Sequence, residues 1–379
     1  MPKAVFGLIG TGGIARSQHL PNLTRATHAR LKTICDLDES RLDNARQRYD
    51  IPHATTDHKE LLADPEIQAV VVATKDDAQA PLTIEALAAG KHVYVEKPLA
   101  TDAETCRKVV EAQRRAGLFV AVGFNRRFAP AYRKVKEILT AHGDARNIYY
   151  RVSDEYWRWG AKMPPGVRVI HEICHMFDAI RWLAGSDVES VYCVNSRPDD
   201  EVIVLKLTSG CVATIMDSGY ATRDMPKERL EIIAEKGGLT VEDFVEMRTF
   251  GMRDFEPIYR FAGHTHPEIE FAHKYILEKL GTEGLLALRR QAWEALDRVE
   301  HLRDDEEFPE RDELVAFTGR GPDVNYMMDK GWLHAVEHFA QCVLSGDAPQ
   351  TATAEDAWKA SALSNAAIKS RESGEIVKI

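Results

Sequence analysis

Residues 5–15 read VFGLIGTGGIA, a short apolar run followed by the glycine-rich turn Gly10-Thr11-Gly12-Gly13-Ile14-Ala15. The apolar run predicts a buried strand and the residues after the turn predict a helix, which is the context in which G-x-G-x-x-A indicates a dinucleotide site. Gly10 permits the tight turn, Gly12 lets the backbone approach a pyrophosphate, and Ala15 lets the helix lie close to the sheet. The N–H groups at the start of the helix would then bind the phosphates. The stretch therefore predicts a cofactor cradle.

A carboxylate follows the second apolar run of the chain. Asp36 comes directly after Leu31–Cys35, at the offset of roughly 20 residues that is typical of a ribose-binding acid. An aspartate there accepts hydrogen bonds from the ribose 2′-OH and repels a 2′-phosphate, so NAD is the expected cofactor and NADP the less favoured one. Arg41 lies nearby, and its guanidinium would either cover the adenine or pair with a 2′-phosphate. A glycine-rich turn without a ligand is the alternative interpretation, and Asp36 argues against it.

Short runs rich in β-branched residues alternate with helical patterns up to about residue 122. The runs are Val5–Ile9, Leu31–Cys35, Val70–Ala73, Val93–Glu96 and Phe119–Val122. Unbroken apolar strands separated by helices indicate a doubly wound parallel sheet with helices on both faces.

The second half of the chain has a different period. Turn residues within 201–220 and within 228–244 predict two hairpins, and hence a mixed, mostly antiparallel sheet. Residues 267–311 are charge-rich with helical spacing and predict a helical insertion. We therefore expect an α/β protein with a Rossmann domain at residues 1–123 and an α+β domain at 124–340. Helices at 341–379 are expected to return and pack on the body.

The composition is that of an ordinary globular protein. The 379 residues are 44% hydrophobic and 28% charged, with a formal net charge of -10. A negative chain without a basic stripe repels a phosphate backbone, so nucleic acid is not an expected partner. No apolar run approaches the roughly 20 residues of a spanning helix, and the N-terminus lacks a signal-peptide pattern, so we expect a cytoplasmic protein that does not bind membranes. The six cysteines lack C-x-x-C spacing and predict neither disulfides nor a cysteine metal site.

Further motifs carry a resemblance to a known family. Residues 90–99 read GKHVYVEKPL, residues 123–128 read GFNRRF, residues 175–183 read HMFDAIRWL and residues 329–331 read DKG. Together with the glycine-rich turn and Asp36, they make the chain similar to the Gfo/Idh/MocA family, the glucose-fructose oxidoreductase and inositol dehydrogenase relatives. The resemblance implies a Rossmann domain, an α+β domain with an open-faced sheet that often forms oligomers, and an active site between them. A homo-oligomer, a dimer or tetramer through that sheet, is therefore expected.

Lys97 and His175 are the catalytic candidates. The resemblance implies that Lys97 contacts the substrate and the nicotinamide ribose, and that His175 accepts or donates the proton. The position of Lys97 agrees with this role, because it follows a strand at the edge where doubly wound sheets bind ligands, and a cation there stabilises the alkoxide formed as hydride leaves. We expect a polyol or sugar to lie over the nicotinamide, with Lys97 and His171 assisting His175 through hydrogen bonds and no metal taking part.

The other site candidates are polar residues near strand ends and aromatic residues in the segment 153–168, which would close the site. They are Thr74, Glu96 and Asn125 toward the cofactor, and Arg126, Arg127, Tyr156 and Trp157 toward the substrate. Arg126 or Arg127 would position the substrate or the carboxamide. The aromatic pair is suited to stacking on a sugar ring, although aromatic residues in such a loop also serve simply to pack it down.

The chain departs from the family pattern in three places. The family usually has Asp or Asn where this chain has His171, glycines where it has residues 165–167, and Thr-Pro-Asn with a following histidine where it has Thr74-Lys75-Asp76 and Gln79. The expected substrate is accordingly a secondary alcohol of a sugar, a sugar derivative or a cyclitol, with the carbon and the direction left open.

Three other functions compete with an NAD-dependent dehydrogenase. Residues 171–175 read HEICH, the H-E-x-x-H motif of zinc hydrolases, which would place His171 and His175 on one helix face. A zinc hydrolase would leave the glycine-rich turn, Asp36 and Lys97 unexplained. Some relatives use NAD transiently to cleave a glycosidic bond, with no net change of NAD. A regulatory protein would keep the cradle and would need neither Lys97 nor His175. A separate alternative for the motif itself is that His171 and His175 are half-buried structural residues of a helix, bonded to backbone or carboxylates.

Overall fold

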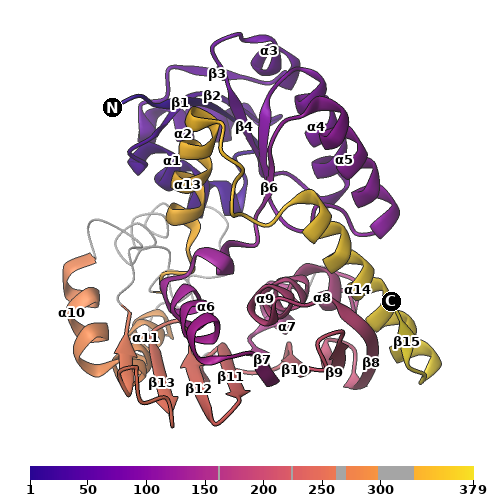
Figure 1. Ribbon diagram of the computed structural model, residues 1–379. Coiled ribbons are helices and arrows are strands. Elements are labelled where there is room, and N and C mark those ends of the chain that lie inside the picture. Colours follow the sequence, from indigo (N-terminus) through magenta and orange to yellow (C-terminus); the bar gives the residue numbers. More distant parts are fainter. Residues whose placement is uncertain (161–162, 223–224, 262–269, 298–327) are drawn as a thin grey trace.

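The first sheet is built by the N-terminal part of the chain. The computed structural model describes residues 1–160, 163–222, 225–261, 270–297 and 328–379. Six parallel strands run in the order β3-β2-β1-β4-β5-β6, the doubly wound order that places ligands outside the carboxyl ends of β1 and β4 (Figure 1). They are β1 Ala4–Ile9, β2 Ala29–Cys35, β3 His53–Thr55, β4 Ala69–Val72, β5 His92–Val95 and β6 Val120–Val122. The five predicted strands are confirmed, and β3 is an additional one.

Helices connect these strands on both faces of the sheet. They are the π-helical turn η1 Ala15–His19, α1 Leu20–Arg25, α2 Glu39–Tyr49, α3 His58–Ala63, α4 Asp76–Ala88 and α5 Ala103–Ala116. Aspartate side chains begin three of them: Asp38, Asp57 and Asp102 each accept a hydrogen bond from a backbone N–H of the first turn. This parallel sheet covered by helices is the Rossmann architecture that the sequence predicts.

The second sheet has nine strands in the order β14-β13-β12-β11-β7-β10-β9-β8-β15. They are β7 Ala145–Ser153, β8 Val188–Arg197, β9 Asp200–Leu207, β10 Val212–Ser218, β11 Glu228–Ala234, β12 Gly237–Glu242, β13 Glu246–Phe250, β14 Ile258–Arg260 and β15 Val377–Lys378. Of the neighbouring pairs, β10 and β7 are parallel and the others are antiparallel. Both predicted hairpins, β9–β10 and β11–β12, are present, so the mostly antiparallel sheet is confirmed.

The remaining helices belong to the second half and to the C-terminus. They are η2 Asn125–Phe128, α6 Pro130–His142, α7 Tyr156–Trp159, α8 Arg168–His171, α9 Cys174–Ala184, α10 Glu270–Leu280, α11 Thr282–Asp297, α13 Trp332–Ser345 and α14 Ala354–Ser373. Figure 1 shows α6 and α9 on the side of the second sheet that faces the first sheet. The predicted insertion at 267–311 is helical in α10 and α11, and its remaining residues lie outside the described part of the chain.

The two halves share helices from the C-terminal part of the chain. Phe339 of α13 packs edge-on against Phe6 and Tyr94 of the first sheet, with ring centroids 6.3 and 5.9 Å away. In α14, Ser361 Oγ donates to Ala100 O in the first half at 3.1 Å, and Ser364 Oγ donates to Val169 O in the second half at 3.0 Å. This helix therefore holds the halves together along one side of the molecule.

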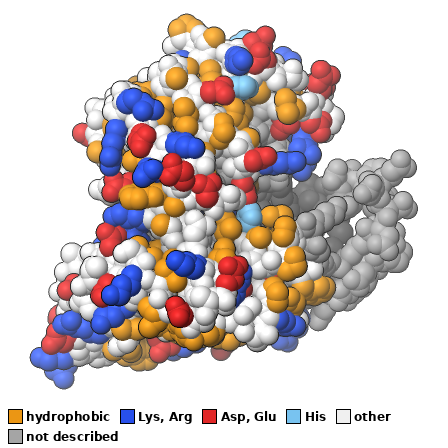
Figure 2. Space-filling view, turned by 90° about the vertical axis from the view of Figure 1, so that its right-hand side faces the viewer, with side chains coloured by type: hydrophobic (Ala, Val, Ile, Leu, Met, Phe, Trp, Pro, Cys, Tyr) orange, Lys and Arg blue, Asp and Glu red, His pale blue; other side chains and the backbone are white. Residues whose placement is uncertain are grey.

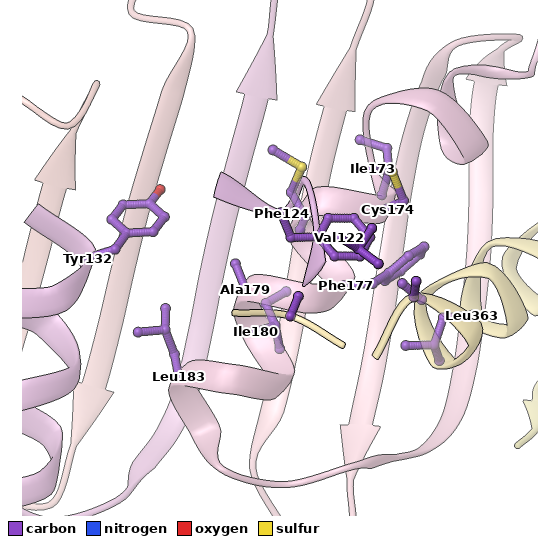
Figure 3. Packing of buried hydrophobic residues seen from close by; sticks show 14 of the residues in the cluster. Val122, Phe124, Tyr132, Ile173, Cys174, Phe177, Ala179, Ile180, Leu183 and Leu363 are labelled. Atoms are coloured by element: carbon purple, nitrogen blue, oxygen red, sulfur yellow. The ribbon is translucent and has the colours of Figure 1, made fainter. Parts of the chain in front are cut away.

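A hydrophobic cluster fixes α9 on the second sheet. Phe177, Ile180 and Leu183 of α9 are buried, and Figure 3 shows them together with Phe124 and with Leu363 of α14.

None of the described helices has the length and apolar character needed to cross a membrane. On the face drawn in Figure 2, positive and negative side chains are interspersed over both halves.

Candidate active site

The glycine-rich turn lies at the carboxyl end of β1. Gly10 has φ of +93°, and a Cβ at this position would lie 2.3 Å from the carbonyl oxygen of Ala73, so both the backbone conformation and the available space require glycine. At Gly12 and Gly13 a Cβ would meet nothing within 4 Å. The backbone between Thr11 and Ala15 is therefore open on the side where a pyrophosphate would approach, and the residues present fit a dinucleotide.

Asp36 is anchored at the end of β2, next to this turn. Its Oδ2 accepts hydrogen bonds from Thr11 N at 2.7 Å and from Thr11 Oγ1 at 2.9 Å, and its Oδ1 accepts from Asp38 N at 3.0 Å. A carboxylate has about four acceptor positions, so one stays available for a ribose hydroxyl. The Nε of Arg41 lies 3.1 Å from Asp38 Oδ2, and both side chains of this ion pair are about half exposed. Arg41 was expected to cover the adenine or to pair with a 2′-phosphate, and here its guanidinium pairs with Asp38.

Lys97 follows β5 and reaches across to the second half. Its Nζ donates to the carbonyl oxygen of His171 at 2.6 Å, and its backbone N–H donates to Glu96 Oε2 at 3.1 Å. An ammonium group has three N–H donors, so Lys97 retains donors for a substrate oxygen. This contact joins the carboxyl edge of the first sheet to the end of α8, three residues before α9 begins.

Glu96 is held by a histidine that sequence analysis did not include. Its Oε1 lies 2.8 Å from His19 Nε2, and both side chains are buried. A Cβ on Gly123 would lie 2.8 Å from Glu96 Oε2, so the glycine makes room for this carboxylate. The structure places Glu96 beneath the site, where it fixes the backbone of Lys97. His19 follows the cradle within the same helical segment, but no local pattern connects it with a residue so far along the chain.

His175 lies in the first turn of α9 and is 5% exposed. The ring of Phe124 packs edge-on against it with centroids 5.6 Å apart, and Nδ1 finds no hydrogen-bond partner among the described residues. Burial lowers the pKa of His175 well below its usual range, and the charges of Arg126 and Lys97 lower it further. The ring is therefore neutral near pH 7 and can accept a proton.

The H-E-x-x-H segment is not one regular helix, contrary to the expectation from its spacing. Helix α8 ends at His171 and α9 begins at Cys174, because the N–H of Ile173 bonds back to Arg168 O at 3.2 Å and interrupts the regular ladder. Glu172 lies 3.0 Å from Lys227 Nζ and 3.5 Å from Arg126 Nη2. Burial alone would raise the pKa of Glu172, but Lys227 and Arg126 hold it well below its usual range. An ion-paired carboxylate of this kind is a poor general base.

The two arginines of the GFNRRF motif point into ion clusters. Arg126 is 3% exposed and donates from Nε and Nη2 to Glu228 at 2.9 and 2.7 Å. Arg127 donates to Asp178 at 2.9 and 2.6 Å and lies 3.1 Å from Asp356 of α14. These pairs tie η2 to the second sheet and to α9. Contact of either arginine with substrate stays a prediction.

The other candidates have different environments. Asn125 is buried, donates from Nδ2 to Lys330 O at 2.6 Å, and leaves Oδ1 without a partner among the described residues. Thr74 lies between β4 and α4, beside the cradle. Tyr156 is buried and its ring faces Gly160 and the guanidinium of Arg168, whereas Trp157 is 52% exposed. Tyr156 thus packs its loop down.

Comparisons with known proteins agree with the fold and with a dinucleotide-binding first half. Residues 5–124 match the model of the oxidoreductase family with an NAD-binding Rossmann fold, and residues 134–240 match the GFO/IDH/MocA C-terminal domain. The inositol 2-dehydrogenase of Rubrobacter xylanophilus is 32% identical over 257 residues, which cover 63% of this chain and 71% of that protein. The uncharacterized oxidoreductase YrbE of Bacillus subtilis is 28% identical over 305 residues, 74% of this chain and 87% of that protein.

Solved structures share the whole fold. Scyllo-inositol dehydrogenase from Lactobacillus casei, with bound NAD(H) and scyllo-inositol, has a TM-score of 0.71 at 18% identity and covers 99% of both chains. An oxidoreductase from Agrobacterium radiobacter, in complex with NAD+, L-tartaric acid and magnesium, has a TM-score of 0.75 at 17% identity, covering 99% of this chain and 98% of that one. With both family models and the R. xylanophilus dehydrogenase matched, the chain belongs to the Gfo/Idh/MocA family of NAD-binding oxidoreductases.

Proposed function

We propose that this protein is an NAD-dependent dehydrogenase that acts on a secondary alcohol of a cyclitol, a sugar or a sugar derivative, with Lys97 and His175 as its catalytic residues. The observation that carries the proposal is the contact of Lys97 Nζ with His171 O, because it joins the cofactor side of the molecule to the segment that bears His175. Several relatives are named inositol 2-dehydrogenases, which makes cyclitols the first substrates to test.

The residues divide the chemistry among them. NAD, when bound in the cradle, supplies the acceptor for the hydride. Lys97 donates to the reacting oxygen and its positive charge stabilises the developing alkoxide. His175 takes the hydroxyl proton, since its buried neutral ring has a free acceptor. Asn125 offers the unpaired Oδ1 to the N–H of the nicotinamide carboxamide.

A substrate screen tests this function. Purified protein is incubated with NAD and with cyclitols, aldoses or sugar nucleotides, and the absorbance of the reduced cofactor is followed. One of these classes should give reduced NAD. Glycoside cleavage without net reduction would instead indicate the redox-assisted hydrolase. Activity that disappears with EDTA and returns with zinc would contradict a metal-free dehydrogenase.

The cofactor preference should follow from Asp36. We expect NAD to bind more tightly than NADP by about 10-fold or more, because a 2′-phosphate loses the hydrogen bond to Asp36 and is repelled by its charge. Asp36→Ser should reduce this difference in affinity between NAD and NADP. Titration of intrinsic fluorescence with each nucleotide gives the two dissociation constants.

Glu39→Gln is the matched control, since it removes one exposed negative charge nearby without touching the anchored carboxylate. It should leave the ratio of the NADP and NAD dissociation constants unchanged. If the wild-type protein bound NAD and NADP equally well, Arg41 rather than Asp36 would determine the cofactor preference.

The open face of the second sheet is the surface through which we propose that the protein forms a homo-oligomer. Val194, Val202 and Met216 are 43, 40 and 41% exposed and lie side by side on β8, β9 and β10, as the strand registers show. A row of exposed apolar side chains on a sheet face is typical of an interface.

Light scattering during gel filtration tests this interface. The wild-type protein should elute above the monomer mass of 42.6 kDa, and Val202→Glu should shift it toward that mass because the new carboxylate would be buried without a partner. Gln47→Glu adds the same charge to exposed α2 and should have no effect. A wild-type monomer at micromolar concentration would contradict the proposal.

A further inference from the structure

An aspartate at the tip of a hairpin in the second sheet has an unusual backbone conformation. The β8–β9 hairpin turns at Pro198 and Asp199, between the paired residues Arg197 and Asp200. Asp199 has φ of +64°, in the left-handed region that favours glycine, and it is only 6% exposed. Since glycine adopts this conformation more easily, the role of the position is to be sought in the buried carboxylate.

The carboxylate of Asp199 binds the start of α8. Its Oδ1 accepts hydrogen bonds from Gly166 N at 3.0 Å and from Arg168 N at 3.2 Å, and its Oδ2 lies 3.0 Å from Gly166 N. These N–H groups flank Val167, the N-cap residue of α8, whose side chain makes no capping hydrogen bond. The first N–H groups of a helix have no partner within it, so Asp199 caps α8 from another element of the fold.

Asp199 is itself held by its neighbours. Its backbone N–H donates to Oε1 of the buried Glu201 at 3.2 Å, and its carbonyl oxygen accepts from Gly219 N at 2.7 Å. Arg371 of α14 donates from Nη1 to the same Glu201 oxygen at 2.6 Å and to Gly166 O at 3.3 Å. The hairpin tip, α14 and the start of α8 therefore form one connected group of hydrogen bonds.

The other end of α8 contacts a catalytic candidate. His171 is the last residue of α8, and its carbonyl oxygen accepts from Lys97 Nζ at 2.6 Å. The helix has only four residues, and its first side chain is also anchored: Arg168 donates to Asp217 and to Asp154, each at 2.7 Å. A helix this short that is held at its start transmits that position to its last carbonyl group. Helix α8 therefore connects the hairpin tip to Lys97.

We propose that Asp199 is a positioning residue of this active site: by capping α8 it fixes the carbonyl oxygen of His171, and with it the ammonium group of Lys97. This inference rests on the proposed function, in which Lys97 stabilises the developing alkoxide. That stabilisation requires a donor placed close to the reacting oxygen, so a displacement of about 1 Å is enough to slow the reaction. Asp199 acts through α8 and is not itself a catalytic residue.

The capping contact can be tested without turnover, by hydrogen exchange of the full-length protein. Asp199→Gly keeps a residue that adopts the positive φ but removes the acceptor, so the amides of Gly166 and Arg168 should exchange about 10-fold faster or more. Asp50→Gly is the matched control, because Asp50 has φ of +50° at the exposed end of α2. It relieves the same kind of strain and should leave these amides unchanged. Unchanged exchange in Asp199→Gly would overturn the inference.

Kinetics test the role in catalysis. Asp199→Gly should lower kcat by about 10- to 100-fold, because the displaced ammonium group acts on the transition state. The KM of the substrate and the dissociation constant of NAD should stay within about 2-fold of the wild type, since the cradle belongs to the first sheet, in the other half of the molecule (Figure 1). Asp50→Gly should behave like the wild type. A raised KM with an unchanged kcat would overturn the positioning role.

Asp199→Asn separates positioning from a folding defect. Asparagine also tolerates a positive φ and keeps an acceptor oxygen in the place of Oδ1, so this variant should recover kcat to within about 3-fold of the wild type. An asparagine variant as slow as Asp199→Gly would overturn the inference. If the wild-type protein turned over no polyol or sugar, the proposed function would fail, and hydrogen exchange would still decide whether Asp199 holds α8.

Discussion

Replacing His175 by alanine should lower turnover by roughly 100- to 10,000-fold while leaving NAD affinity nearly intact. The side chain is buried against Phe124 with an unpaired Nδ1, and its lowered pKa keeps it neutral, so its expected role is to accept a substrate proton. It lies on the segment that Lys97 reaches rather than on the glycine-rich turn. The loss should therefore appear in kcat measured with the best substrate of the screen, not in the dissociation constant of NAD.

Two further variants separate chemistry from packing. His175→Gln fills most of the space left by the ring but cannot take the proton, so it should be nearly as slow as His175→Ala. His58→Ala removes a histidine that pairs with Glu85 on the surface of α3, and it should stay within about 2-fold of the wild type. A His175→Ala enzyme that retained more than a tenth of its activity would show that another group takes the proton first.

Local sequence patterns were sufficient for most of the first sheet. Its strands are unbroken apolar runs, and the glycines between β1 and η1 are required by backbone geometry that the sequence displays directly. The strand β3 was not predicted because His53–Thr55 is only three residues long and has no apolar run. It is a strand because the edge of β2 offers its backbone groups partners.

Residues at the candidate site were predictable by type, whereas their contacts were not. The spacing of His171 and His175 suggested one helix face, but the helix is interrupted between them. Arg126 was expected near the substrate, and its guanidinium lies against Glu228, a residue from the second sheet that no local pattern relates to it. Asp76 stood out in the sequence only as a departure from the family pattern, and its contact with Nδ1 of His171 could not be predicted because His171 belongs to the other half of the molecule.

Replacing Glu228 by glutamine should lower the free energy of unfolding by about 3–5 kcal/mol, as is typical when one partner of a buried ion cluster is removed. Glu228 is 1% exposed, accepts from Arg126 at 2.9 and 2.7 Å, and lies 3.0 Å from Lys330 Nζ. Glutamine keeps the shape of the side chain but removes a negative charge that Arg126 and Lys330 share, and Glu172, 3.5 Å from Arg126, does not replace it. Urea unfolding of the two proteins measures the difference.

Acid should remove the same stabilisation from the wild-type protein. Burial alone would raise the pKa of Glu228, but Arg126 and Lys330 lower it from 4.5 to about 2. Because the pKa is lower in the folded state, the ionised carboxylate stabilises the fold fully above about pH 4.5, and this stabilisation is lost as the pH falls toward 2. The free energy of unfolding of Glu228→Gln should therefore depend less steeply on pH between these two values. Glu231→Gln on the same strand is the control: its pair with Arg229 is 41 and 39% exposed, and its loss should cost less than about 1 kcal/mol. Equal losses in the two variants would mean that the cluster around Glu228 does not hold η2 to the second sheet.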